Sequence, residues 1–261
     1  MAEPPRVLVT RTANQAEAFS QKLRAAGFTP VEFPTIQLEP LPWGPLDEAL
    51  IALPRFDWVI FTSGNAVDFF LRRMDRLNLA LENLSQVAAV GSATARRLAE
   101  RGITIDYMPD EFVGTELVLG LGDLTGKMVL LPRAKIGRPE IADLLQERGA
   151  ELTEVALYDT VTAVPTPNAW TELNKGFAAI TFTSPSSVRN FFKIMASHPD
   201  QLPIPLEKML QQALVVCIGP VTAEATAEAG LTDTLIPEEY TIDGMVQQLK
   251  FALLVRYQRN T

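Results

Sequence analysis

The sequence has one cysteine, Cys217, and one histidine, His198, among its 261 residues. A lone cysteine cannot form a disulfide within the chain, which favours a reducing compartment and predicts a cytoplasmic protein. One thiol and one imidazole are also too few for a metal site built from cysteine and histidine ligands. His198 stands in the polar stretch "SHPDQ", where we interpret it as a solvated loop residue, and this argues against a Ser-His-Asp or Cys-His hydrolase.

Long apolar runs and nucleotide-binding loops are missing as well. The longest apolar stretches, such as "LVVCIG" and "WVIF", fall far short of the roughly 20 residues that span a bilayer. The first residues, "MAEPPRVLVT", lack the basic flank and apolar core of a secretory signal. No GxGxxG or Walker-type loop occurs, and the net charge of −8 argues against a broad nucleic-acid surface. We therefore predict no membrane or nucleic-acid partner and, for an enzyme, no metal, nucleotide or other cofactor.

What the sequence does contain is an internal repeat. Each repeated piece reads as a short apolar strand, a small polar turn and a helix. A glycine that can end the helix in the left-handed conformation often follows. Three pairs of segments match in the same order, namely 7–34 with 129–156, 56–70 with 177–192, and 87–103 with 215–231.

The order of these pieces predicts the fold class. Strands that alternate with helices indicate parallel sheets. The strands are apolar nearly throughout, as expected where helices cover both faces of a sheet. We predict an α/β protein of two similar lobes, each a parallel sheet flanked by helices on both faces, joined by a two-segment linker.

Two proline-dense stretches, 34–45 and 162–170, lie at equivalent places in the two copies. Proline extends and stiffens such segments, so we predict that the chain crosses between the lobes twice. The alternative is a tandem pair of contiguous domains that meet near residues 120–127, with the proline stretches as surface loops. The predicted division is 1–36 plus 168–261 for the first lobe, 42–160 for the second, and 37–41 and 161–167 for the linkers.

Four of the predicted turns are rich in hydroxyl side chains and glycine. Such turns stand at the carboxyl ends of parallel strands, where helix N-termini offer N–H groups to carboxylates and phosphates. Each turn alone can be a simple helix cap, but the doubled set predicts an anion-binding cleft between the lobes. The candidate residues in these turns are Thr62, Ser63, Gly64, Gly91, Ser92, Thr94, Thr183, Ser184, Ser186, Gly219 and Thr222.

Basic residues stand close to the same strand ends. Thr10 and Arg11 end the first predicted strand, and Arg133 ends its counterpart, ahead of Lys135 and Arg138. Guanidinium groups pair with carboxylates in a fork geometry. As a group these residues predict a ligand that carries several carboxylates.

Tyr158, in the predicted strand "ALYDTV", is the remaining chemical candidate. Its phenol can act as a general acid, or it can be a strand tyrosine with one wet edge. The residues alone leave three functions open: an enzyme acting on a polycarboxylate, a hinged non-catalytic binding protein for such a metabolite, and a transferase acting on a sugar or nucleotide. The missing phosphate loop weakens the last of these.

An ordered set of motifs resembles the uroporphyrinogen-III synthase (HemD) family. The set comprises "VLVTR", "FTSGNAV", "AVGSATARRL", "LLPRAKIGR", "EVALYDT", "FTSPSSV" and "IGPVTAEA". The hydroxyl turns alone are unspecific, whereas their order together with Arg138 and Tyr158 is specific. The resemblance implies a cofactor-independent hydro-lyase of tetrapyrrole and heme biosynthesis. It would convert hydroxymethylbilane, a linear tetrapyrrole, into uroporphyrinogen III with loss of water and inversion of ring D through a spiro intermediate.

The resemblance also implies roles for single residues. Tyr158 would be the acid that assists departure of the hydroxyl group, and Arg138 would bind a substrate carboxylate. Thr94, Ser184 and Thr222 would line the substrate cleft. A transient hand-over of substrate from hydroxymethylbilane synthase is a further expectation, and we expect a monomer because the sequence carries no signal for an oligomer.

Overall fold

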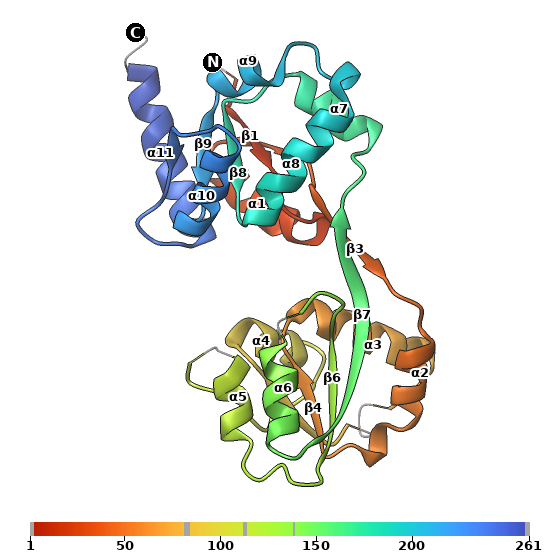
Figure 1. Cartoon of the computed structure of the whole chain (residues 1–261). Coiled ribbons are helices and arrows are strands. Elements are labelled where there is room, and N and C mark those ends of the chain that lie inside the picture. The colour runs from red at the N-terminus through yellow and green to blue at the C-terminus, as the bar shows by residue number, and fades with distance from the viewer. Residues whose placement is uncertain (1–2, 81–83, 112–113, 138, 259–261) are drawn as a thin grey trace. The chain divides into compact units, whose positions relative to one another are not determined.

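The computed structural model describes residues 3–80, 84–111, 114–137 and 139–258. The chain divides into two compact units (Figure 1). Unit 1 consists of Met1–Gln37 with Val161–Thr261, and unit 2 of Leu38–Thr160. Among the residues that the structure describes, no helix combines the length and the apolar character that a membrane crossing needs.

Unit 1 is a five-stranded sheet with the order β10-β9-β8-β1-β2, and its neighbouring strands run parallel. Leu8 faces one apolar core with α7, α8, α9 and α10, whereas Val7 and Val9 face a second core with α1 and α11. Helices therefore cover both faces, as predicted. The strands are β1 (Arg6–Val9), β2 (Thr29–Glu32), β8 (Ala179–Phe182), β9 (Leu214–Cys217) and β10 (Thr234–Leu235), and the helices are α1 (Ala13–Ala25), α7 (Pro167–Asn174), α8 (Pro185–Ser197), the short η3 (Pro199–Gln201), α9 (Leu206–Gln211), α10 (Pro220–Glu228) and α11 (Ile242–Gln258).

Unit 2 repeats this plan with the strand order β3-β7-β6-β4-β5. Val59 and Phe61 of β4 face a core with α2, α3 and α4, and Trp58 and Ile60 face a core with α5 and α6. The strands are β3 (Ile36–Pro40), β4 (Trp58–Phe61), β5 (Gln86–Ala89), β6 (Met128–Ala134) and β7 (Glu151–Thr162), and the helices are α2 (Gly44–Ile51), the short η1 (Leu53–Arg55), α3 (Gly64–Arg76), α4 (Ser92–Ala99), α5 (Gly114–Gly120) and α6 (Glu140–Glu147).

The strand β3 departs from the predicted parallel arrangement. The N–H of Leu41 donates to the carbonyl of Leu157 at 3.0 Å, and the N–H of Ala163 donates to that of Thr35 at 3.1 Å. As the residue number rises along β3, the number of its partner in β7 falls. The strand β3 therefore lies antiparallel to β7, at the edge of a sheet that is otherwise parallel. An antiparallel neighbour follows because the chain enters unit 2 through β3 and leaves it through β7.

The two crossings between the units fall within these two strands, after Gln37 and after Thr160. The proline-dense stretches therefore contribute residues to β3 and β7. The lobe boundaries predicted from the prolines, at residues 36, 42, 160 and 168, stay a prediction.

The internal repeat is visible in the helices α3 and α8. Ser63 caps α3 by accepting the N–H of Ala66, and Ser184 caps α8 by accepting that of Ser187, both at 3.2 Å. An N-cap hydroxyl satisfies one of the backbone donors that a helix leaves unpaired at its start. The matching segments "FTSGNAV" and "FTSPSSV" therefore fold in the same way, as strand, cap and buried helix.

An ion pair joins α2 to α3 in unit 2. Arg73 donates Nε and Nη2 to the two carboxylate oxygens of Asp47, each at 2.6 Å, and its Cζ lies 5.3 Å from the ring centroid of Trp43. Hydrogen bonding to the Arg73 side chain is the main reason that the pKa of Asp47 is lowered. The pair therefore favours the ionised form of Asp47 in the folded protein.

We expect Asp47→Asn to lower the stability of the protein at neutral pH by weakening this pair. Because the folded-state pKa of Asp47 lies below its unfolded value, the contribution is complete above the unfolded value and is lost as the pH falls through the folded one. Urea unfolding of the parent protein and of Asp47→Asn, at pH 7 and below about pH 4, measures the free energy of unfolding of each. The gap between Asp47→Asn and the parent protein should shrink at the lower pH, and an equal gap at both would assign the effect to packing.

Candidate active site

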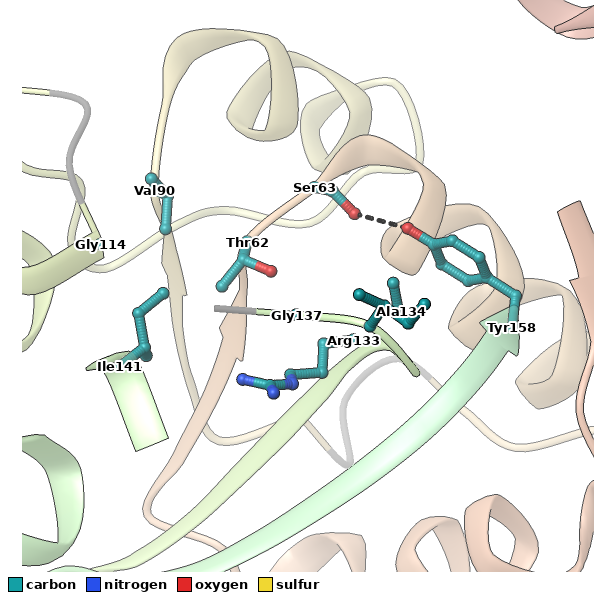
Figure 2. Close-up of a pocket in the computed structure, with 10 residues that line it drawn as sticks. Thr62, Ser63, Val90, Gly114, Arg133, Ala134, Gly137, Ile141 and Tyr158 are labelled. Carbon is teal, nitrogen blue, oxygen red and sulfur yellow. Dashed lines mark hydrogen bonds between the residues drawn. The ribbon is translucent and has the colours of Figure 1, made fainter. Parts of the chain in front are cut away.

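A cavity of about 480 Å³ opens in unit 2, where the strands β4, β5 and β6 end (Figure 2). The carboxyl end of a parallel sheet is the usual ligand side of an α/β fold. Four of the residues predicted from the sequence lie together on its wall: Thr62, Ser63, Arg133 and Tyr158. We call this space the unit-2 cavity.

The phenol of Tyr158 is held from two sides. Its hydroxyl lies 3.2 Å from Oγ of Ser63, as the dashed line in Figure 2 shows. Its ring stacks on Phe69 of α3, with 4.9 Å between centroids and 22° between planes. Tyr158 is only 4% exposed, so the side chain has little freedom to leave this position.

A bulge in β7 explains how Tyr158 reaches α3. The pairing of β6 with β7 advances by single residues up to Arg133 with Ala156 and then shifts, so that Ala134 pairs with Tyr158. Leu157 is the extra residue, and both Leu157 and Tyr158 pack into the same core. In a regular strand, consecutive side chains point to opposite faces. The bulge thus turns Tyr158 onto the face where Ser63 and Phe69 lie.

Arg133 supplies the positive charge of the cavity wall. Its side chain is 11% exposed, and Nε lies 3.5 Å from a carboxylate oxygen of Glu154. Nearby, Lys135 pairs with Asp159 at 2.8 Å, and this hydrogen bond is the main cause of a lowered pKa of Asp159. The wall therefore combines a largely buried guanidinium with neutral hydroxyl groups. Arg138, which was predicted to bind a carboxylate, lies outside the described residues.

Aliphatic side chains form another part of the wall. Val90 and Ile141 lie away from Tyr158 in Figure 2, and Ile136, which is 77% exposed, also lines the cavity. Sequence reasoning missed these residues because it searched the strand ends for polar groups. Their position in the sequence was the available signal. Val90 is the first residue after β5 and Ile136 the second after β6, as Thr62 and Ser63 are the first and second after β4. The cavity suits a ligand with both charged and apolar parts.

The other predicted residues of unit 2 stand near the same strand ends. Gly64 is the first residue of α3, Gly91 is the N-cap of α4, and Ser92 begins that helix. Ser92 is exposed, whereas Thr94 is only 6% exposed. None of these four is among the residues that the structure describes as lining the cavity.

The predicted residues of unit 1 gather at the ends of β1, β8 and β9. Thr10 is fully buried, and its hydroxyl donates to the carbonyl of Thr181 at 2.7 Å. Arg11 donates from Nη2 to Gln15 at 3.1 Å, and partial burial lowers its pKa.

The turns after β8 and β9 hold the remaining candidates. Thr183 follows β8, Ser184 caps α8, and Ser186 lies with its Oγ 3.0 Å from that of Ser184. After β9, Gly219 is the N-cap of α10, and Thr222 is 3% exposed. All seven unit-1 candidates therefore belong to one end of one sheet, and their role in binding stays a prediction.

The fold and the site together define a class, an α/β protein of two sheet units with a charged and hydroxyl-lined site at strand ends. Within the described residues, no group of three histidine, cysteine, aspartate or glutamate side chains is placed to hold a metal ion. The family model described as "Uroporphyrinogen-III synthase HemD" matches residues 17–247. The chain belongs to this family.

Individual relatives agree with the family. The chain is 35% identical to uroporphyrinogen-III synthase of Synechococcus elongatus, over 94% of this chain and 96% of the relative. It is 30% identical to the synthase of Chlorobaculum parvum, over 90% and 93%. Its activity is that of a uroporphyrinogen-III synthase, a hydro-lyase of porphyrin and tetrapyrrole biosynthesis that needs no cofactor. The function inferred from the motifs is thus confirmed.

Solved structures support the fold. The uroporphyrinogen-III synthetase of Helicobacter pylori aligns with a TM-score of 0.63 at 19% identity, over 96% of this chain and 99% of that one. A mutant synthase of Thermus thermophilus aligns with a TM-score of 0.60 at 24% identity, over 96% and 99%. The predicted fold class, α/β with two helix-flanked sheets, is confirmed, with the antiparallel β3 as its one correction.

Proposed function

We propose that the unit-2 cavity is where the hydroxyl group of hydroxymethylbilane leaves, with Tyr158 as the general acid. The observation that carries this proposal is the phenol itself, buried on the cavity wall, stacked on Phe69 and 3.2 Å from Ser63 Oγ. Proton transfer to a leaving oxygen lies within the ordinary repertoire of tyrosine. Because the stacked ring and the Ser63 hydroxyl fix the orientation of the phenol, its O–H needs little reorientation during the reaction.

The reaction then runs through charge-separated steps. Tyr158 gives its proton to the departing hydroxyl, which leaves as water, and the substrate becomes an azafulvene cation. Ring D is attacked at its substituted carbon to form a spiro-pyrrolenine, which fragments and recloses with ring D inverted. The ring carbon that bonds last loses a proton, and the phenolate of Tyr158 can take it back. One water leaves overall and the phenol is restored.

Arg133 is proposed to bind a carboxylate of the substrate. A guanidinium that is 11% exposed and stands on a cavity wall loses little solvation when a carboxylate replaces the remaining water. Every ring of hydroxymethylbilane carries an acetate and a propionate, so one arginine cannot serve the whole molecule. We propose that Arg138 and the hydroxyl turns of each unit bind the other carboxylates through side chains and helix N-terminal N–H groups.

The aliphatic part of the wall is proposed to contact a pyrrole ring. Val90, Ile136 and Ile141 offer apolar surface beside the polar groups. Ring closure without the enzyme gives the isomer in which ring D is not inverted, so the enzyme must favour one attack over another. Holding the reacting carbon close to its partner can supply that preference without further chemical groups.

The protein is further proposed to work in the cytoplasm as a monomer. Its one cysteine, Cys217, is buried, and burial raises the pKa of its thiol to about 11. This inert thiol fits a reducing compartment. A transient hand-over of substrate from hydroxymethylbilane synthase completes the proposal, because a reactive linear tetrapyrrole closes by itself when it is released.

An isomer assay tests the proposal. The purified protein is supplied with freshly generated hydroxymethylbilane, the product is oxidised, and isomers I and III are separated by chromatography. We expect isomer III with the protein and isomer I in buffer alone. Tyr158→Phe should shift the product toward isomer I, because the enzymatic route then competes poorly with spontaneous closure. A product that stays isomer III at the parent rate would remove Tyr158 from the mechanism.

A further inference from the structure

The backbone at Gly137 lies directly against the guanidinium of Arg133. A Cβ atom built on Gly137 would stand 2.7 Å from both Cζ and Nε of Arg133, and 3.1 Å from Nη2. Non-bonded carbon atoms settle about 3.5–4.0 Å apart. Only a residue without a side chain therefore fits at this position while Arg133 keeps its place.

Backbone conformation does not account for this glycine. Seven other glycines of the described chain adopt positive φ angles, in the region that side chains disfavour, and Gly137 is not among them. Alanine could adopt the backbone conformation of Gly137. What excludes a methyl group there is the arginine.

The loop that carries Gly137 is anchored to β7, the strand that carries Tyr158. The N–H of Lys135 donates to the carbonyl of Tyr158 at 2.8 Å, and its Nζ pairs with Asp159 at 2.8 Å. These contacts hold the start of the loop on β7, so the backbone cannot easily retreat from Arg133. The guanidinium is the movable partner, since it is the far end of a flexible side chain.

We propose that Gly137 is a positioning residue for Arg133. Because Gly137 has no side chain, the backbone of the loop can lie against the guanidinium of Arg133 and keep that charge on the wall of the unit-2 cavity. This inference rests on the proposed role of Arg133 in binding a substrate carboxylate. A methyl group at residue 137 displaces the guanidinium from that position, and the affinity for the substrate falls while the fold persists.

Gly44 offers a matched control for substitution by alanine. It lies in α2, a Cβ atom there would meet nothing within 4 Å, and its φ is not positive. Gly44→Ala adds the same methyl group to the same unit without touching a side chain. We expect it to leave KM and kcat unchanged and to keep or slightly raise the unfolding midpoint, because alanine fits this helical position and loses less conformational entropy on folding.

The experiment is a double-mutant cycle of Gly137→Ala and Arg133→Leu, assayed with hydroxymethylbilane. Leucine keeps part of the aliphatic stem of Arg133 and removes Nε and the guanidinium. We expect each single variant to raise KM by about tenfold or more, the size of a lost hydrogen bond to a charged group. The double variant should be no worse than Arg133→Leu, because Gly137 acts only through the guanidinium.

Each outcome decides between the two proposals. A KM unchanged by Arg133→Leu overturns the proposed role of Arg133 and this inference with it. A loss with Arg133→Leu but none with Gly137→Ala, or losses that multiply in the double variant, overturns the inference alone. If Gly137→Ala also lowers the unfolding midpoint, recovery of that midpoint in the Arg133→Leu background supports the contact, and failure to recover contradicts it.

Discussion

Tyr158→Phe is expected to lower kcat by about 10²-fold or more, the range that a general acid contributes. The substitution removes one oxygen atom and nothing else from the cavity wall. The phenylalanine ring still stacks on Phe69, and Ser63 still accepts the N–H of Ala66 at 3.2 Å. The fold should therefore survive, with a loss of stability of about 1 kcal/mol at most. Initial rates at saturating substrate, together with a urea unfolding curve, measure both effects.

Tyr107→Phe is the matched control for this prediction. Tyr107 belongs to the same unit, where it packs against Gly120, and it is not among the residues that line the cavity. Removing its hydroxyl should leave kcat near the parent value. If Tyr107→Phe and Tyr158→Phe reduced kcat equally, the loss would be one of packing, and Tyr158 would have no special chemical role.

Phe70→Ala is expected to lower the free energy of unfolding by about 3–5 kcal/mol, as large-to-small substitutions of buried aromatic residues do. Phe70 of α3 is fully buried and packs edge-on against Phe61, with 5.2 Å between centroids and 84° between planes. Its loss leaves a cavity beneath the helix that Ser63 caps. We expect lower activity as well, because the position of Tyr158 depends on α3 through Ser63 and Phe69.

Chemical denaturation with urea measures this effect, and Phe251→Ala provides its control. Phe251 of α11 is 68% exposed, so the same truncation there should change stability by no more than about 0.5 kcal/mol. Similar losses for both variants would show that the core of unit 2 can collapse around the missing ring. A large loss of stability with unchanged activity would contradict the proposed dependence of Tyr158 on α3.

The internal repeat extends to the packing of the matching segments. Phe61 with Phe70 in unit 2 and Phe182 with Phe191 in unit 1 form equivalent edge-on pairs, at 5.2 Å and 5.7 Å. Both pairs come from the matching segments 56–70 and 177–192. A strand followed by a capped amphipathic helix is encoded by nearby residues, so similar strings produced similar local structure.

The repeat did not reveal where the two units differ. Phe69 in unit 2 stacks on Tyr158, whereas Asn190, its counterpart in the aligned segments, accepts a hydrogen bond from Thr162 at 3.2 Å. The position that stacks on a phenol in unit 2 is thus occupied in unit 1 by a residue with a different partner. Nothing in the two strings themselves indicates which partner each of these residues meets, because the partner is distant in the sequence.

The sequence by itself determined the alternation of strands and helices, the hydroxyl caps at their junctions and the family. These features depend on local periodicity, on residue type and on the order of motifs. Only the tertiary structure decided that β3 runs antiparallel, that the backbone at Gly137 lies against Arg133, and that a bulge turns Tyr158 toward Ser63. Each of these depends on the register or approach of two segments, and such pairings are set by packing across the fold rather than by either segment alone.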